Sequence, residues 1–138
     1  MRPISRSRAR THIFTVPLIR QEILKAAREG NCVLVGRGAA CALANQPGCF
    51  HVFVYATAAA KRAWFVNAFP KQADQADQML AAYDKRRAAV IRKAYQQEWC
   101  ARGLYHMLLN SVMGSDCMIA AVAGATHLAP VQAEAVSG

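Results

Sequence analysis

Short apolar runs that alternate with helical stretches are the feature that most constrains how this chain can fold. Residues 32–35, 50–55 and 105–110 are rich in β-branched, aromatic and other apolar side chains, which favours strands. Helical patterns lie between these runs and after the last one. Strands that alternate with helices are joined by right-handed crossovers and pair in parallel. The sequence therefore predicts an α/β fold in which helices flank a three-stranded parallel sheet in three layers.

Helices are predicted from apolar spacing, capping residues and breakers. They are expected over residues 15–29, 39–44, 58–69, 74–99 and 118–123. A chain of 138 residues, 54% of them hydrophobic, is long enough to bury one core. We expect a single α/β domain over residues 15–125, between a basic flexible tail over 1–14 and a second flexible tail over 126–138.

Charge and cysteine usage narrow the class of protein. Seventeen Lys and Arg against eight Asp and Glu give a formal charge of +9, which attracts nucleotides, nucleic acid or anionic lipid alike. The five cysteines lack the spacing of a metal site, and we expect reduced, buried thiols in a cytoplasmic protein. No apolar run is long enough for a membrane helix or a signal peptide, so no membrane partner is expected.

The first candidate site is the turn Gly36-Arg37-Gly38, which follows an apolar run and precedes a helical pattern. Backbone N–H groups in such a turn can face an anion, and the Arg37 guanidinium can hold a phosphate with two hydrogen bonds. An ordinary tight turn with a solvated arginine is the alternative. A Rossmann dinucleotide site is disfavoured, because no acidic residue ends the strand at Tyr55 to bind a ribose.

The second candidate site lies on the long basic helix. Asp84 and Arg87 are three residues apart and hence neighbours on a helix, and Arg86, Arg92 and Lys93 add positive charge within a few turns. Such a cluster can neutralise phosphate charge. A solvated helix face with an ordinary ion pair is the alternative.

Five segments occur in a recognisable order between residues 18 and 123. They are residues 31–39, 51–56 with 61–63, 84–87, 95–99 and 105–111. In this order they resemble the cytidylate-kinase-like family of P-loop phosphotransferases. The resemblance implies ATP-dependent phosphorylation of a nucleoside monophosphate such as CMP, with Mg²⁺ carried by the nucleotide.

The resemblance also implies roles for particular residues. Arg37, with Gly36 and Gly38, would lie near the monophosphate, and Arg62 would belong to the helix beside it. Asp84 and Arg87 would match the lid that grips the phosphates. The catalytic residues stay unknown at this point, and no metal ligand is expected in this chain.

One departure from the family is large. The 138 residues contain no G-x-x-x-x-G-K-[ST] loop to hold the β- and γ-phosphates of ATP. In this fold the P-loop strand lies between the strand near Val33 and the strand near Val52. We therefore expect a truncated or degenerate P-loop kinase-like domain that is inactive alone, has no support of its own for ATP or Mg²⁺, and needs the missing N-terminal segment or a partner chain.

Two readings from other classes of protein remain open. The chain could be a non-enzymatic basic module that binds nucleic acid or an acidic protein, in which case its affinity falls steeply with salt and shows no base preference. It could also be a helper subunit that is completed by a strand from another polypeptide.

Overall fold

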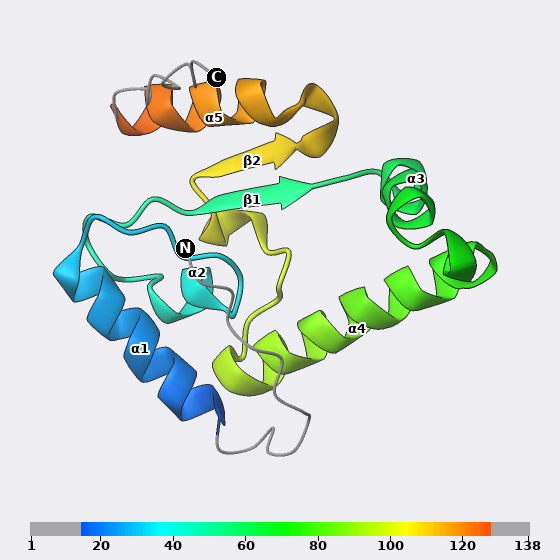
Figure 1. Ribbon diagram of the computed structural model, residues 1–138. Coiled ribbons are helices and arrows are strands. Elements are labelled where there is room, and N and C mark those ends of the chain that lie inside the picture. Colours follow the sequence, from blue (N-terminus) through cyan, green and yellow to red (C-terminus); the bar gives the residue numbers. More distant parts are fainter. Residues whose placement is uncertain (1–14, 128–138) are drawn as a thin grey trace, which may run out of the picture.

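The structure is a computed structural model that describes residues 15–127, and these form five α-helices and a two-stranded parallel sheet (Figure 1). The predicted tail over 1–14 and all but the first two residues of the tail over 126–138 lie outside the described residues. In chain order the helices and strands are α1 (Thr15–Glu29), α2 (Ala39–Ala42), β1 (Val52–Tyr55), α3 (Ala58–Ala68), α4 (Ala76–Tyr95), β2 (Met107–Asn110) and α5 (Ser115–Thr126). No helix among the described residues is both long and apolar enough to cross a membrane.

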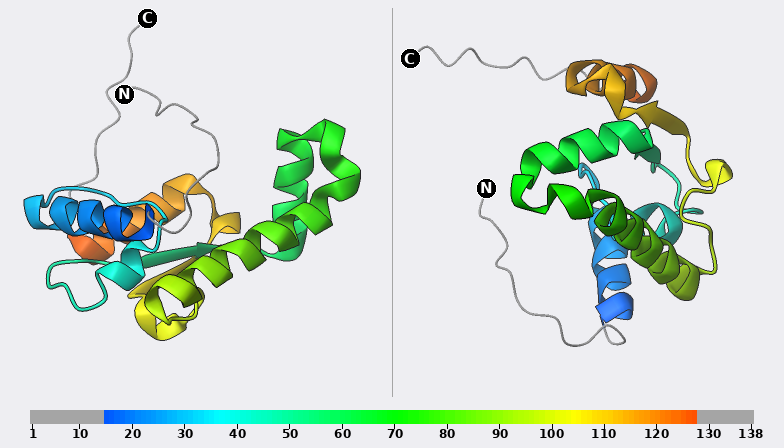
Figure 2. Two further views of the ribbon diagram at one scale, coloured as in Figure 1. Left: turned by 90° about the horizontal axis from the view of Figure 1, so that it is seen from below. Right: turned by 90° about the vertical axis from the view of Figure 1, so that its right-hand side faces the viewer.

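The sheet confirms part of the predicted topology. β1 and β2 pair in parallel, with Val52 opposite Met107 and Tyr55 opposite Asn110. Figure 2 shows α1 and α5 on one side of this sheet and the C-terminal part of α4 on the other. Helices thus flank a parallel sheet as the alternating pattern predicts.

The prediction of a strand over residues 32–35 is wrong. Residues 32–35 form no strand, and within residues 15–127 their N–H groups make no backbone–backbone hydrogen bond. Val33 is 89% exposed and Val35 is 86% exposed. Strand propensity reports the fit of side chains to a pleated surface, but a strand exists only where a neighbour pairs with its backbone. The described residues place no such neighbour beside this segment, so the sheet has two strands instead of three.

The α3–α4 hairpin follows from local chemistry. Thr57 Oγ1 accepts a hydrogen bond from the Ala60 N–H at 3.2 Å and so caps α3. Pro70 lacks an N–H, and α3 gives way to the short 3₁₀ helix η1 (Pro70–Gln75). α4 then runs to Tyr95 and ends where Gln96 adopts φ 54°, so the helix predicted over 74–99 is shorter at both ends.

Two small apolar clusters hold the helices together. Ile23 of α1 packs with Ala39 and Leu43, and Leu34 is packed against this cluster. Under the α3–α4 hairpin, Phe65 is only 2% exposed, with its ring 5.2 Å from that of Phe69. These contacts fix α1 to α2 and α3 to the helices that follow it.

Candidate functional site

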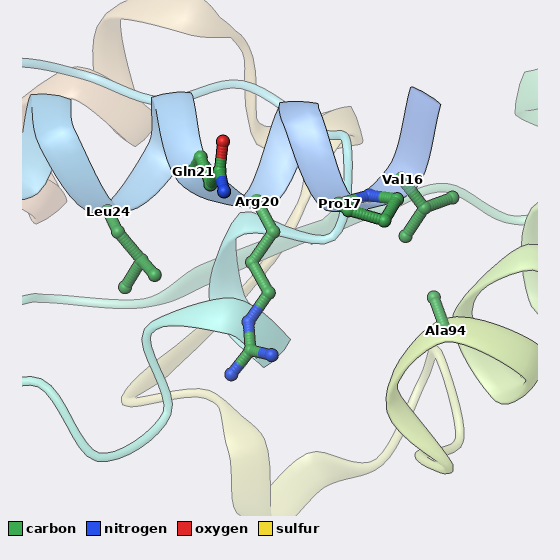
Figure 3. A pocket seen from close by; sticks show the side chains of 6 residues that line it. All are labelled: Val16, Pro17, Arg20, Gln21, Leu24 and Ala94. Atoms are coloured by element: carbon green, nitrogen blue, oxygen red, sulfur yellow. The ribbon is translucent and has the colours of Figure 1, made fainter. Parts of the chain in front are cut away.

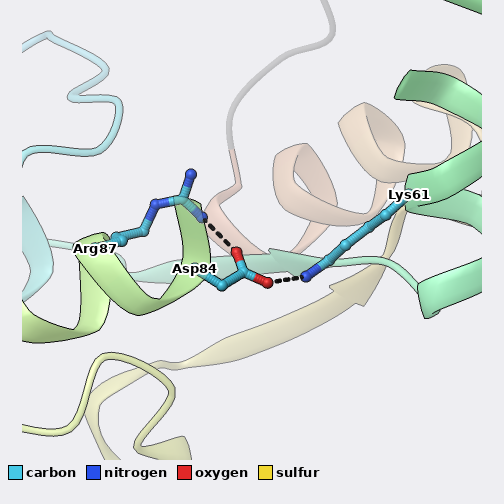
Figure 4. Close-up of polar contacts among 3 residues, drawn as sticks. All are labelled: Lys61, Asp84 and Arg87. Carbon is cyan, nitrogen blue, oxygen red and sulfur yellow. Dashed lines mark hydrogen bonds and ion pairs between the residues drawn. The ribbon is translucent and has the colours of Figure 1, made fainter. Parts of the chain in front are cut away.

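One carboxylate binds two cations from two different helices. Lys61 Nζ of α3 donates to Asp84 Oδ2 at 2.7 Å, and Arg87 Nη1 lies 3.5 Å from Asp84 Oδ1 (Figure 4). The Asp84 side chain is 37% exposed and that of Arg87 is 55% exposed. We call these three residues the Asp84 cluster. The predicted proximity of Asp84 and Arg87 is confirmed.

Lys61 is a member of the cluster that the sequence pattern does not identify as a site residue. It lies in the first turn of α3, where its N–H donates to the Thr57 carbonyl at 2.9 Å, just beyond the carboxyl end of β1. Its neighbour Arg62, which was singled out, instead contacts Asp77 at 3.4 Å on a well-exposed part of the surface. The sequence shows that Lys61 and Arg62 are adjacent basic residues. Only the rotation of α3 relative to α4 determines which of the two faces Asp84.

Arg87 is held by an aromatic side chain as well as by Asp84. Its guanidinium carbon lies 4.6 Å from the centre of the Trp99 ring, within the range of a cation–π interaction. Trp99 in turn packs edge-on against Phe53 of β1, with ring centres 5.6 Å apart, and its carbonyl accepts a 2.8 Å hydrogen bond from the Tyr105 hydroxyl. The guanidinium is therefore positioned by the Trp99 ring and by the Asp84 carboxylate, while more than half of the Arg87 side chain is exposed to solvent.

The turn at residues 36–38 packs against the C-terminal end of α4. All three residues have positive φ, namely 70°, 58° and 74°. A Cβ on Gly38 would lie 2.6 Å from Tyr95 Cε2 and 3.0 Å from Ile91 Cδ1, so the backbone approaches α4 as closely as glycine allows. Arg37 makes no ion pair or side-chain hydrogen bond within residues 15–127. Because α2 has only four residues, its dipole adds little to anion binding at this turn.

The turn and the Asp84 cluster share one stripe of α4. Asp84, Arg87, Ile91 and Tyr95 recur at helical spacing, so they lie along one face of the helix. Ile91 lies seven positions after Asp84, which is about 10 Å along the helix axis. The structure therefore aligns the two predicted sites along α4, while Arg62 pairs outside the cluster.

Two hollows of the surface lie away from the Asp84 cluster. One of about 310 Å³ separates α1 from the end of α4 and is lined by Val16, Pro17, Arg20, Gln21, Leu24 and Ala94 (Figure 3). Burial raises the pKa of Tyr95 next to it, the nearby Cys41 raises this pKa further, and Arg20 opposes the shift. The other, of about 410 Å³, is bordered by His51 and His106, and the His51 N–H donates to His106 Nδ1 at 2.9 Å.

The five cysteines differ in exposure. All five are free thiols, and Cys32, Cys100 and Cys117 are exposed, so the expectation that they are buried is wrong for these three. Burial raises the pKa of Cys41, which keeps this thiol protonated and weakly nucleophilic.

The residues that the structure describes show no metal-binding group and no triphosphate-binding loop. No three His, Cys, Asp or Glu side chains between positions 15 and 127 come together in a way that could hold a metal ion. The Gly36-Arg37-Gly38 turn offers neither the length nor the lysine of a loop that cradles a triphosphate. The two cations of the Asp84 cluster can form charge-assisted hydrogen bonds with an anion.

Comparison with known proteins identifies the family. A model of the cytidylate kinase-like family matches residues 6–112 of the 138, a range that includes every described element from α1 to β2 and stops before α5. Searches of curated proteins and of solved structures found no match. Because the match spans well over half of the chain, this protein belongs to the cytidylate kinase-like family.

Proposed function

We propose that this chain binds a nucleoside monophosphate such as CMP, with the phosphate between Lys61 and Arg87. The observation that carries the proposal is the sharing of Asp84 by two cations from two helices. One carboxylate neutralises only one of the two positive charges, so the cluster keeps a net positive charge. Membership in the family, which implies nucleotide ligands, supports this assignment.

The energetics of the cluster favour binding over stabilisation as its role. Ion pairs that are as exposed as these contribute only about 0–1 kcal/mol to stability. The two cations are nevertheless well positioned, Lys61 by the first turn of α3 and Arg87 by the face of Trp99. A planar guanidinium fixed in this way can bind a phosphate with two parallel hydrogen bonds.

We assign Arg37 to the far end of the same ligand. The 36–38 turn packs on the stripe of α4 that carries Asp84, and Arg37 has no ion-pair partner within the described residues. Gly36 and Gly38 supply the backbone conformation that this turn needs. Arg62 serves as an outer charge beside the cluster, where it pairs with Asp77.

We further propose that these 138 residues do not phosphorylate CMP by themselves. They contain no loop for the triphosphate of ATP, which would have to be held by another segment or by a partner chain. The chain then contributes the monophosphate side of a phosphotransferase.

Calorimetric titration with CMP tests the binding site. Arg87→Gln and Lys61→Met are each expected to weaken binding at least about tenfold, or about 1.4 kcal/mol, since each removes one charge-assisted contact to the phosphate. Lys85→Met is the matched control, because Lys85 is an exposed lysine on the same helix with no ion pair among the described residues. It should leave the affinity within about twofold.

Other outcomes would favour the basic-module reading. One such outcome is an equal loss of CMP affinity in the Arg87, Lys61 and Lys85 variants, with a steep dependence of affinity on salt and no preference for a base. It would indicate binding to phosphate backbones through the outer face of α4. Formation of ADP at an ordinary kinase rate, when ATP and Mg²⁺ are added to the CMP complex, would contradict the proposal that the chain is inactive alone.

A further inference from the structure

The hollow of about 410 Å³ lies at the amino ends of the two strands, and its volume is in the range of small-molecule sites. His51 directly precedes β1, His106 directly precedes β2, and both border the hollow. The two arrows in Figure 1 point away from this end of the sheet and toward α3, whose first turn carries Lys61. The hollow and the Asp84 cluster therefore lie at opposite ends of the sheet.

Hydrogen bonds to the backbone fix the proton positions on both imidazole rings. The Leu43 carbonyl can only accept, so the proton lies on His51 Nε2, which donates to this carbonyl at 3.2 Å. The His51 N–H can only donate, so His106 Nδ1, 2.9 Å away, carries no proton. In the neutral rings, Nδ1 of His51 is then a bare acceptor and Nε2 of His106 carries an N–H donor.

These two ring atoms have no partner in the part of the chain that the structure describes. No hydrogen bond within residues 15–127 uses His51 Nδ1 or His106 Nε2. His51 is only 9% exposed, yet none of the described side-chain nitrogens and oxygens is both unpaired and shut off from solvent. Nδ1 of His51 therefore opens on the hollow that this residue borders. A buried acceptor of this kind gains most from a donor that is placed inside the hollow.

The rest of the lining is polar but uncharged. Among the described residues no Lys, Arg, Asp or Glu borders the hollow, although the whole chain has a formal charge of +9. A charged ligand would lose its hydration here without gaining a counter-charge. The side-chain amides of Asn45 and Gln97 add further donors and acceptors to the lining. The rings of His51 and His106 stack with centres 5.3 Å apart and planes 17° apart, so two nearly parallel rings present the acceptor and the donor.

We propose that this hollow binds a small, uncharged molecule with a lactam or amide edge. The N–H of the ligand donates to Nδ1 of His51, and its C=O accepts from the Nε2–H of His106. A lactam places an N–H donor and a C=O acceptor side by side, which complements the acceptor and the donor of the two rings. The site goes beyond monophosphate binding and does not depend on it, since it lies at the other end of the sheet and offers no charge for a phosphate.

An NMR titration of the ¹⁵N-labelled chain with 2-pyridone, a flat lactam, tests the site. We expect saturable shift changes at the His51 amide and at the side-chain amides of Asn45 and Gln97, at the millimolar concentrations that so small a ligand requires. The amides of Lys61 and Arg87 should stay unchanged. 1-Methyl-2-pyridone keeps the ring and the carbonyl but lacks the N–H, so it should bind at least about tenfold more weakly.

Two variants remove one ring atom each and keep the hydrogen bond to the backbone. His51→Gln keeps a donor for the Leu43 carbonyl, because the amide nitrogen takes the place of Nε2, but it removes the acceptor. His106→Asn keeps an acceptor for the His51 N–H and removes the Nε2–H donor. Each should weaken the binding of 2-pyridone at least about tenfold.

His127→Asn is the matched control. His127 lies at the C-terminal end of α5, does not border the hollow, and has a φ of 55° that asparagine tolerates. This variant should leave the affinity within about twofold. Far-UV circular dichroism verifies that the variants are folded, and the two pyridones test the unaltered chain whether or not they are. The proposal is overturned if 2-pyridone causes no saturable shift, if its methylated form binds equally well, or if all three variants lose affinity equally.

Discussion

Replacing Phe65 with alanine is expected to lower the free energy of unfolding by about 3–5 kcal/mol. Phe65 is 2% exposed and is the largest fully buried side chain among the described residues. Its removal deletes the packing between α3 and the segment around Phe69, and the small surrounding cluster can fill the cavity only in part. For a chain with a core this thin, that cost is a large share of a typical total stability.

The neighbouring residue is the matched control. Trp64 is also large and aromatic but is 63% exposed, so Trp64→Ala should cost only about 0.5 kcal/mol. Urea unfolding followed by far-UV circular dichroism measures both variants without depending on tryptophan fluorescence. Equal destabilisation by the two substitutions would show that α3 packs differently. Because Lys61 reaches Asp84 only while α3 is docked, Phe65→Ala should also weaken CMP binding.

Gly38→Ala is expected to cost about 2–4 kcal/mol, the second-largest effect. Two penalties add at this position. The residue has φ 74°, which strains any L-amino acid, and the new Cβ would lie 2.6 Å from the ring of Tyr95 and 3.0 Å from Ile91. The 36–38 turn must then move away from α4, which carries Arg37 away from the stripe of the Asp84 cluster.

Gly36→Ala separates the two penalties. Gly36 has nearly the same φ, 70°, but a Cβ there meets nothing within 4 Å. It should therefore cost only the backbone strain of about 1–2 kcal/mol. Thermal and urea unfolding measure the free energy of unfolding of Gly38→Ala and of Gly36→Ala. The difference between the two losses is the cost of the steric contact with Tyr95 and Ile91. A difference of zero would mean that the turn does not rest on Tyr95.

Local signals predicted much of the fold. Thr57 and Pro70 mark the ends of α3, and short continuous apolar runs mark both strands, β-branched and aromatic at β1 and mostly Met and Leu at β2. Residues 32–35 carry the same signal without forming a strand. Propensity is a property of the segment itself, whereas pairing depends on a neighbour that no local pattern reveals.

The candidate site was predictable to the extent that it lies within one helix. Asp84 and Arg87 are three residues apart on α4, and helical spacing alone brings them together. The contributions of Lys61 and Trp99 depend on how α3 and the segment after α4 pack, so their distance in sequence conceals them. The choice between Lys61 and Arg62 is likewise made by the rotation of α3, which spacing within a single helix does not determine.

The most direct test of nucleotide binding in this chain is an NMR titration of the ¹⁵N-labelled protein with CMP. The proposed monophosphate site predicts saturable shift changes at the amides of residues 36–38 and at Lys61, Asp84 and Arg87, together with a shift of the Trp99 indole N–H. The amides of Lys85 and Lys93 on the outer face of α4 should change little. Shifts confined to that outer face, or no saturable shift at any residue, would contradict the proposed monophosphate site.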